Sequence, residues 1–119
     1  MAINIKNGNI SWEKPLNMEI YHKPLHLSGK NLILAGKKEL SLYDVSTGDL
    51  LKTIKMVYEV KNILVGNNEI YVLTENNLLY TLKSISLEKI SEKKLDDKAT
   101  IFMIDNSLFI VGRNFMIKN

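Results

Sequence analysis

Two histidines four residues apart, His22 and His26, are the side chains in this sequence whose spacing most readily suggests chemistry. On a helix, that spacing would present both imidazoles to one metal ion. Pro24 lies between them, however, and proline is not tolerated in a helix interior. In an extended segment the two residues would lie about 13 Å apart at roughly 3.3 Å per residue, too far for one ion. We therefore interpret both histidines as structural or surface residues.

No other arrangement in the sequence is typical of a catalytic or cofactor site. A GxSxG nucleophile elbow, a phosphate-binding glycine loop and a motif-placed histidine–carboxylate pair are all absent from it. Asp96 and Asp97 lie in a polar stretch, which favours a solvated turn over an acid–base pair. Tyrosines in strands are expected to pack their rings into the fold while the hydroxyl group stays in contact with water. The sequence thus predicts no catalytic, cofactor-binding or metal-binding residue.

Composition indicates one ordinary globular domain. The chain has 119 residues, of which 45% are hydrophobic and 24% charged, and these shares are normal for a folded domain of that length. It contains no cysteine, which excludes disulfides, thiolate metal sites and cysteine nucleophiles. No apolar run approaches the roughly 20 residues that span a bilayer, and the first residues do not resemble a signal peptide. We expect a cytoplasmic protein without a membrane partner.

The basic charge is mild and scattered. The formal net charge is +3, and Arg113 is the only arginine among 16 basic residues. Recognition of phosphates and bases usually depends on the bidentate fork of arginine and on clustered basic residues. The charge pattern therefore argues against nucleic-acid binding. Scattered lysines instead help to keep the edges of β-sheets from pairing with other chains.

A regular repeat is the strongest pattern in the sequence. Two sets of evenly spaced positions show it, namely Leu32, Ile70 and Leu108, and Gly36, Thr74 and Gly112. Their period of about 38 residues lies in the range of roughly 20–50 that is typical of repeat architectures. Short strands rich in β-branched and aromatic residues, separated by turn residues every 8–12 positions, favour the four-stranded blade of a β-propeller over a helical repeat. The sequence therefore predicts an all-β fold of propeller blades.

The clearest unit runs from Leu32 to Ile54. It predicts a strand, a tight turn at Gly36, a second strand carrying Leu40, Leu42 and Val45, a Thr47–Gly48 turn and a third strand. Later in the chain, Ser86–Ile90 is expected to close the next unit. The polar stretch Ser91–Lys98 is interpreted as a connector with room for one helical turn.

The repeats divide the 119 residues into four units of a single domain. The expected ranges are a partial blade at 1–18, blades at 20–57 and 58–95, and a partial blade at 99–119. A propeller usually needs about four to eight blades around its axis. About three periods are present, which leaves two alternatives. The partial units join into a ring, within one chain or between chains, or the sequence is a piece of a longer propeller.

The first 16 residues carry a motif that identifies a family resemblance. The pattern Ala2-x-Asn4-x-x-x-Gly8-x-x-x-Trp12 resembles the docking motif of quinoprotein-like, pyrroloquinoline-quinone-type propeller repeats, with Asn4 in place of an aspartate. The next unit keeps Asp44, Thr47 and Gly48 at the matching offsets but has lysine in place of tryptophan. The stretch LYDVSTGDLLKTI is also similar to a WD-repeat strand, so both subfamilies remain open.

These motif residues have physical roles that do not depend on the resemblance. Gly8 and Gly48 would permit positive φ in a turn. Asn4 and Asp44 could accept backbone N–H bonds before that turn. Trp12 could place a large apolar face against a neighbouring blade. We expect structural roles for these residues rather than contact with a ligand.

The resemblance does not imply a cofactor for this chain. Quinone-dependent members of the family use larger propellers, acidic calcium ligands and often a cysteine pair, and this sequence matches none of these features. The leading hypothesis is a non-catalytic β-propeller module that scaffolds or binds proteins, as a homo-oligomer or with another protein. The alternative is a fragment of a larger propeller enzyme, such as a quinoprotein-like dehydrogenase or a lactonase, whose active site lies elsewhere.

Overall fold

The computed structural model describes residues 2–3, 10–12, 16, 19–22, 25–26, 31–66, 68–95, 99–105 and 107–118, and every regular element within them is a β-strand. No helix in this part of the chain is long and apolar enough to cross a membrane. The strands form one two-stranded sheet and three larger antiparallel sheets. The all-β prediction is therefore confirmed.

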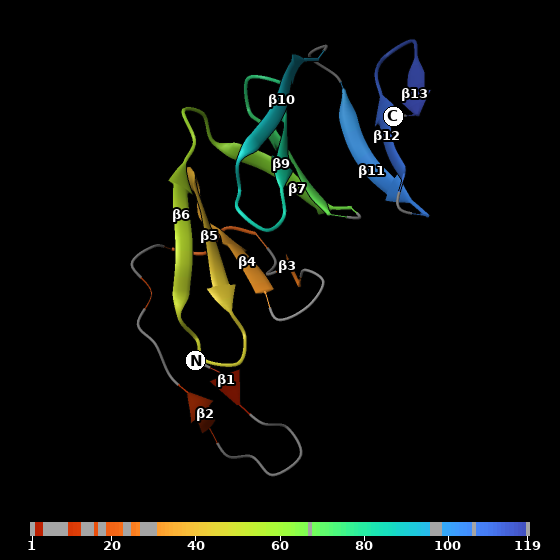
Figure 1. The fold of residues 1–119 in the computed structure, drawn as a ribbon. Coiled ribbons are helices and arrows are strands. Elements are labelled where there is room, and N and C mark those ends of the chain that lie inside the picture. Colours follow the sequence, from red (N-terminus) through yellow and green to blue (C-terminus); the bar gives the residue numbers. More distant parts are fainter. Residues whose placement is uncertain are drawn as a thin grey trace.

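Each larger sheet is built from strands that follow one another in the sequence. The first sheet contains β3 (Leu25–His26), β4 (Asn31–Ala35), β5 (Glu39–Asp44) and β6 (Leu50–Lys55). The second contains β7 (Val60–Val65), β8 (Glu69–Thr74), β9 (Leu78–Lys83) and β10 (Lys89–Lys94). The third contains β11 (Thr100–Ile104), β12 (Ser107–Val111) and β13 (Met116–Lys118). The remaining pair is β1 (Ala2–Ile3) with β2 (Ile10–Trp12). Figure 1 shows the three larger sheets side by side in chain order.

The regular step of the repeat places one inner strand in each larger sheet. Strands β4, β8 and β12 begin at Asn31, Glu69 and Ser107, which are evenly spaced in the sequence. Each is hydrogen-bonded on both sides, so its two faces are its only contact surfaces. A tight turn follows each of them, and in the first and third sheets the N–H of Gly36 and of Gly112 donates to the carbonyl three residues later, at 2.9 Å in both cases. The repeat read from the sequence is thus a repeat in space.

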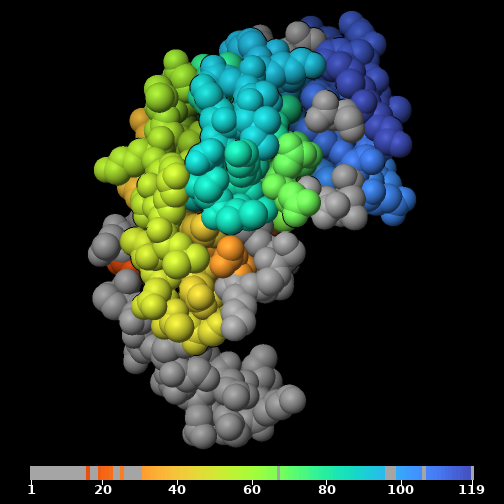
Figure 2. Space-filling view, in the orientation of Figure 1, coloured from red at the N-terminus to blue at the C-terminus, as the bar shows by residue number. Residues whose placement is uncertain are grey.

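The core lies between the sheets, in two separate apolar layers. One layer joins the first sheet to the second through residues such as Ile33, Leu42 and Val72. The other joins the second sheet to the third through residues such as Leu73 and Leu108. Figure 2 shows the second sheet between the other two.

Strand β8 explains why the sequence shows continuous apolar runs. Ile70 and Val72 belong to the layer against the first sheet, whereas Tyr71 and Leu73 belong to the layer against the third. All four side chains are buried. Successive side chains in a strand point to opposite faces, so a strand packed on both faces has no polar alternation.

The interpretation of Ser91–Lys98 as a connector is wrong for its first half. Residues 91–94 belong to β10, the outermost strand of the second sheet, and the residues of β10 are all exposed. A strand that packs on neither face needs no alternation of apolar and polar residues. The lysine and glutamate residues of β10 therefore give no periodic pattern from which a strand can be predicted. For the same reason the closing strand expected at Ser86–Ile90 is placed too early, because β10 ends at Lys94. Val45 also lies beyond the end of β5, in the following turn, and is exposed.

Candidate functional site

The turn between β5 and β6 is held by the motif residues of the first sheet. The Asp44 carboxylate accepts backbone N–H bonds from Ser46 at 2.8 Å and from Thr47 at 3.3 Å. The Thr47 hydroxyl oxygen accepts the N–H of Asp49 at 3.2 Å. Gly48 has φ of 76°, in the left-handed region that glycine enters without steric cost. All of these bonds serve the backbone of the turn.

The second sheet repeats this turn with different residues. The backbone of Lys83–Glu88 makes the same two closing bonds as that of Asp44–Asp49, all at 2.8–2.9 Å. The Ser86 hydroxyl oxygen takes the place of Thr47 and accepts the N–H of Glu88 at 3.4 Å. Leu87 takes the place of Gly48 with φ of 61°. A residue motif does not reveal this copy of the turn, because its residue types differ although its backbone conformation is the same.

The pairing of β1 with β2 has the same register as the two hairpins that contain these turns. Ala2 pairs with Trp12 and Ile3 with Ile10, with a bulge between. Leu42 pairs with Lys52 and Tyr43 with Leu50, again with a bulge. The second sheet shows the pattern once more, where Thr81 pairs with Ser91 and Leu82 with Lys89. Ser11, Leu51 and Ile90 are the bulged residues. Asn4 and Gly8 lie outside the described residues, as do the side chains of Ala2 and Trp12.

His22 contacts the backbone of the second sheet through its side chain. Its Nε2 atom lies 2.8 Å from the carbonyl oxygen of Val60, which opens the second sheet. Its own backbone N–H donates to the carbonyl oxygen of Ala35 at 3.4 Å. The imidazole therefore connects the approach to the first sheet with the edge of the second. His26 pairs with Leu32 in β3, and its side chain, like Asp96 and Asp97, lies outside the described part.

Further polar contacts link the first two sheets at the same end. Lys37 and Glu59 form an ion pair at 3.2 Å, and the hydrogen bond to Glu59 raises the pKa of Lys37. Both side chains are exposed, so the pair contributes little to the stability of the fold. Within the described ranges, no group of three His, Asp or Glu side chains could hold a metal ion.

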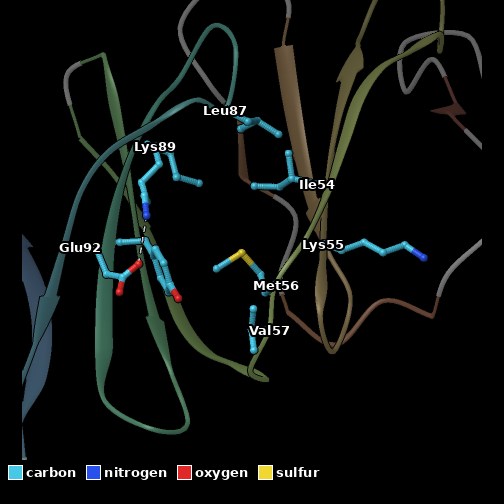
Figure 3. Close-up of a pocket in the computed structure, with 9 residues that line it drawn as sticks. Ile54, Lys55, Met56, Val57, Leu87, Lys89 and Glu92 are labelled. Carbon is cyan, nitrogen blue, oxygen red and sulfur yellow. Dashed lines mark hydrogen bonds and ion pairs between the residues drawn. The ribbon is translucent and has the colours of Figure 1, made fainter.

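A groove of about 260 Å³ opens between the first and second sheets. Its apolar wall includes Ile54, Met56 and Leu87, and Lys89 pairs with Glu92 at its rim at 3.2 Å. Figure 3 shows Met56 directed into the groove and Lys55 directed away from it. Burial, followed by the nearby Glu92 carboxylate, raises the pKa of Tyr80, another lining residue. The groove is therefore a seam between two sheets, lined by apolar side chains together with Tyr80, Lys89 and Glu92.

The comparisons with known proteins agree on the fold. No family model matches the sequence, and no curated protein matches it. Three of the matching solved structures, all at low sequence identity, are the following. BamB from Moraxella catarrhalis aligns over 87% of this chain and 34% of its own, at 15% identity and a TM-score of 0.70. AztD from Citrobacter koseri in its apo form aligns over 69% of this chain and 26% of its own, at 18% identity and a TM-score of 0.59. Hsv2 from Kluyvelomyces marxianus aligns over 76% of this chain and 30% of its own, at 12% identity and a TM-score of 0.59.

All three of these structures are β-propellers, and this chain spans about a third of each or less. At such low identity the likeness concerns the fold alone. Together with the series of stacked antiparallel sheets, it shows that the chain has the fold of part of a β-propeller, with each larger sheet as one blade.

Proposed function

We propose that the chain is a non-catalytic propeller module that binds protein, and that it self-associates. The observation that carries this proposal is the open edge of the third blade. Within the described residues, β13 pairs only with β12, whereas the first and second blades each have a fourth strand beyond the equivalent position. An edge strand with free backbone groups is a template for a strand from another chain.

The chemistry of the described residues supports a binding role over a catalytic one. The polar side chains that can be traced, such as Asp44, Thr47 and His22, hold turns and connect blades. Within the described part, no buried side-chain nitrogen or oxygen atom lacks a hydrogen-bond partner. Active sites often retain such unpaired or strongly perturbed groups. Backbone edges and exposed apolar side chains such as Met116 are available for contact with another protein.

Self-association can be tested by co-expressing two copies of the full chain, one with an affinity tag and one without. Capture of the untagged copy in a stoichiometric amount is the expected result. An untagged copy that stays in the flow-through, although both copies are folded by circular dichroism, would contradict self-association.

The repeats are proposed to be of the quinoprotein-like type. Support comes from the shared register of Ala2 with Trp12 and of Leu42 with Lys52, which makes the first hairpin a structural copy of a later one. A cytoplasmic location is part of the same proposal and rests on the absence of cysteine from the sequence. A fluorescent fusion excluded from the cytoplasm would contradict it.

A second candidate is a piece of a longer propeller enzyme, such as a quinoprotein-like dehydrogenase or a lactonase. The observation in its favour is coverage, because the chain spans 26–34% of the three propellers it resembles. The coding sequence on both sides decides between the two candidates. Further periods of the same length in frame would favour the enzyme fragment, and stop codons next to the chain would remove that candidate's support.

A further inference from the structure

One face of the third blade is mainly apolar and is not covered by the second blade. Ile101, Leu108 and Ile110 point into the layer shared with the second blade. Neighbouring strand residues point the opposite way, so the other face carries Phe102, Phe109, Val111 and Met116, which we call the rear face. Lys118, which pairs with Phe109, lies on the same side of the sheet. The rings of Phe102 and Phe109 stack with their centroids 5.4 Å apart. Met116 is 68% exposed.

The second blade shows what such a face receives. Its equivalent residues are Leu64, Tyr71, Leu73 and Leu79, which occupy the same pairing positions. Leu64 pairs with Tyr71, and Leu73 with Leu79. In the third blade Phe102 pairs with Phe109, and Val111 with Met116. In the second blade these four residues pack against Ile101, Leu108 and Ile110 of the next blade. The rear face of the third blade is therefore built to receive another blade.

The matching surface occurs at the start of the first blade. Two repeats back from Leu108 and Ile110 lie Leu32 and Leu34, on the side of β4 that faces away from the second blade. Leu34 is already buried within its own chain, whereas Leu32 is half-buried. Leu32 is therefore the residue of the pair that is open to a contact. Figure 1 places β4 and the third blade at opposite ends of the row of blades.

We propose that the rear face of the third blade binds the β4 side of the first blade of a second copy, head to tail. This inference rests on the proposed self-association and adds the surfaces that meet. The described part of each chain contains three larger sheets, so these parts of two copies, joined twice in this way, supply six blades. That number lies within the range of about four to eight that closes a propeller. The contact repeats the apolar layer already formed twice inside each copy.

The chain contains no cysteine, so introduced thiols report on single positions. Met116→Cys and Leu32→Cys copies, carrying different tags, are co-expressed and treated with a short bismaleimide reagent. The expected product is a covalent dimer containing both tags. Ile85→Cys, at a residue that is 79% exposed in the outer turn of the second blade, replaces Met116→Cys as the matched control and should give at least ten-fold less of the dimer.

Three results would count against the inference, and they separate it from the proposed function. If the copies assemble in a stoichiometric amount but the Met116→Cys and Leu32→Cys copies cross-link no more than the Ile85→Cys control, the proposed docking surfaces are wrong and self-association still stands. Cross-links mainly between two Met116→Cys copies overturn the head-to-tail arrangement in favour of a symmetric contact. A folded wild-type monomer overturns self-association itself. As an independent readout, Met116→Lys should weaken the assembly at least ten-fold while Ile85→Lys does not, with both variants keeping the wild-type circular dichroism spectrum.

Discussion

Gly48 and Leu87 occupy the same position in two consecutive outer turns, and both have positive φ, at 76° and 61°. Each donates its N–H to the carbonyl oxygen four residues earlier, in Asp44 and Lys83 respectively, at 2.8 Å. The backbone of the turn therefore recurs, although one copy uses glycine and the other a large side chain. The difference lies in what the side chain contributes, because Leu87 is buried against the first blade.

Gly48→Val should lower the free energy of unfolding by about 1–2 kcal/mol, because the left-handed region costs a residue with a Cβ atom about that much and β-branching adds to the clash. Gly48→Asn is the matched variant and should lose less stability than Gly48→Val, because asparagine tolerates the left-handed region. Urea denaturation followed by circular dichroism measures both. Equal stability of Gly48→Val and the wild type would contradict the turn geometry.

Leu87→Ala should cost about 2–5 kcal/mol in spite of its strained backbone, because truncation of a buried leucine leaves a cavity. The neighbouring Ile85 is 79% exposed, so Ile85→Ala should change stability by no more than about 0.5 kcal/mol. Thermal or urea denaturation of the two variants provides the comparison. A loss of the same size at both positions would show that Leu87 does not fill the layer between the blades.

Trp12→Ala should cost about 3–5 kcal/mol if the indole packs against a neighbouring blade, as expected for a buried aromatic side chain. Trp12 is the only tryptophan in the chain, so its fluorescence reports on this position alone. The wild-type emission maximum should lie toward the blue and move to longer wavelength on unfolding. Two results together would contradict the docking role. The folded protein would emit at the wavelength of free tryptophan, and Trp12→Ala would lower the free energy of unfolding by no more than an ordinary surface substitution, about 0.5 kcal/mol.

Stability should fall at high pH. Burial and then the hydrogen bond to Glu69 raise the pKa of Tyr71 above its ordinary value of 10.0. Because the folded pKa is the higher one, the stabilisation is complete below pH 10 and is lost as the pH rises through the folded value. Urea denaturation between pH 8 and 11 should show a decline that is smaller in Tyr71→Phe. An identical decline in both proteins would contradict the shift.

Much of the fold can be predicted from the sequence because it depends on local patterns. Buried strands such as β8 appear as apolar runs, and the spacing of Leu32, Ile70 and Leu108 fixes the repeat. Strand β10 escapes prediction because the apolar pattern that signals a strand reports packing, and its residues pack on neither face. A strand of that kind is defined by backbone pairing alone, which leaves little trace in residue type.

The candidate surfaces are harder to predict, for a different reason. The hydrogen bond between His22 and Val60 and the rear face of the third blade both depend on which blades are neighbours. Phe102 and Phe109 look like ordinary core residues in the sequence. Only their pairing, and the equivalence with Leu64 and Tyr71, shows that their side of the blade is left without a neighbouring sheet in the described structure.

The mass of the full-length chain in solution tests the central claim most directly. Native mass spectrometry over a range of micromolar concentrations should show a folded species containing two copies, and small-angle X-ray scattering should give a radius of gyration well above the 15.4 Å of one copy. A folded protein that remains a single copy, with a radius near that value at every concentration, would contradict the claim that these blades assemble with those of another chain.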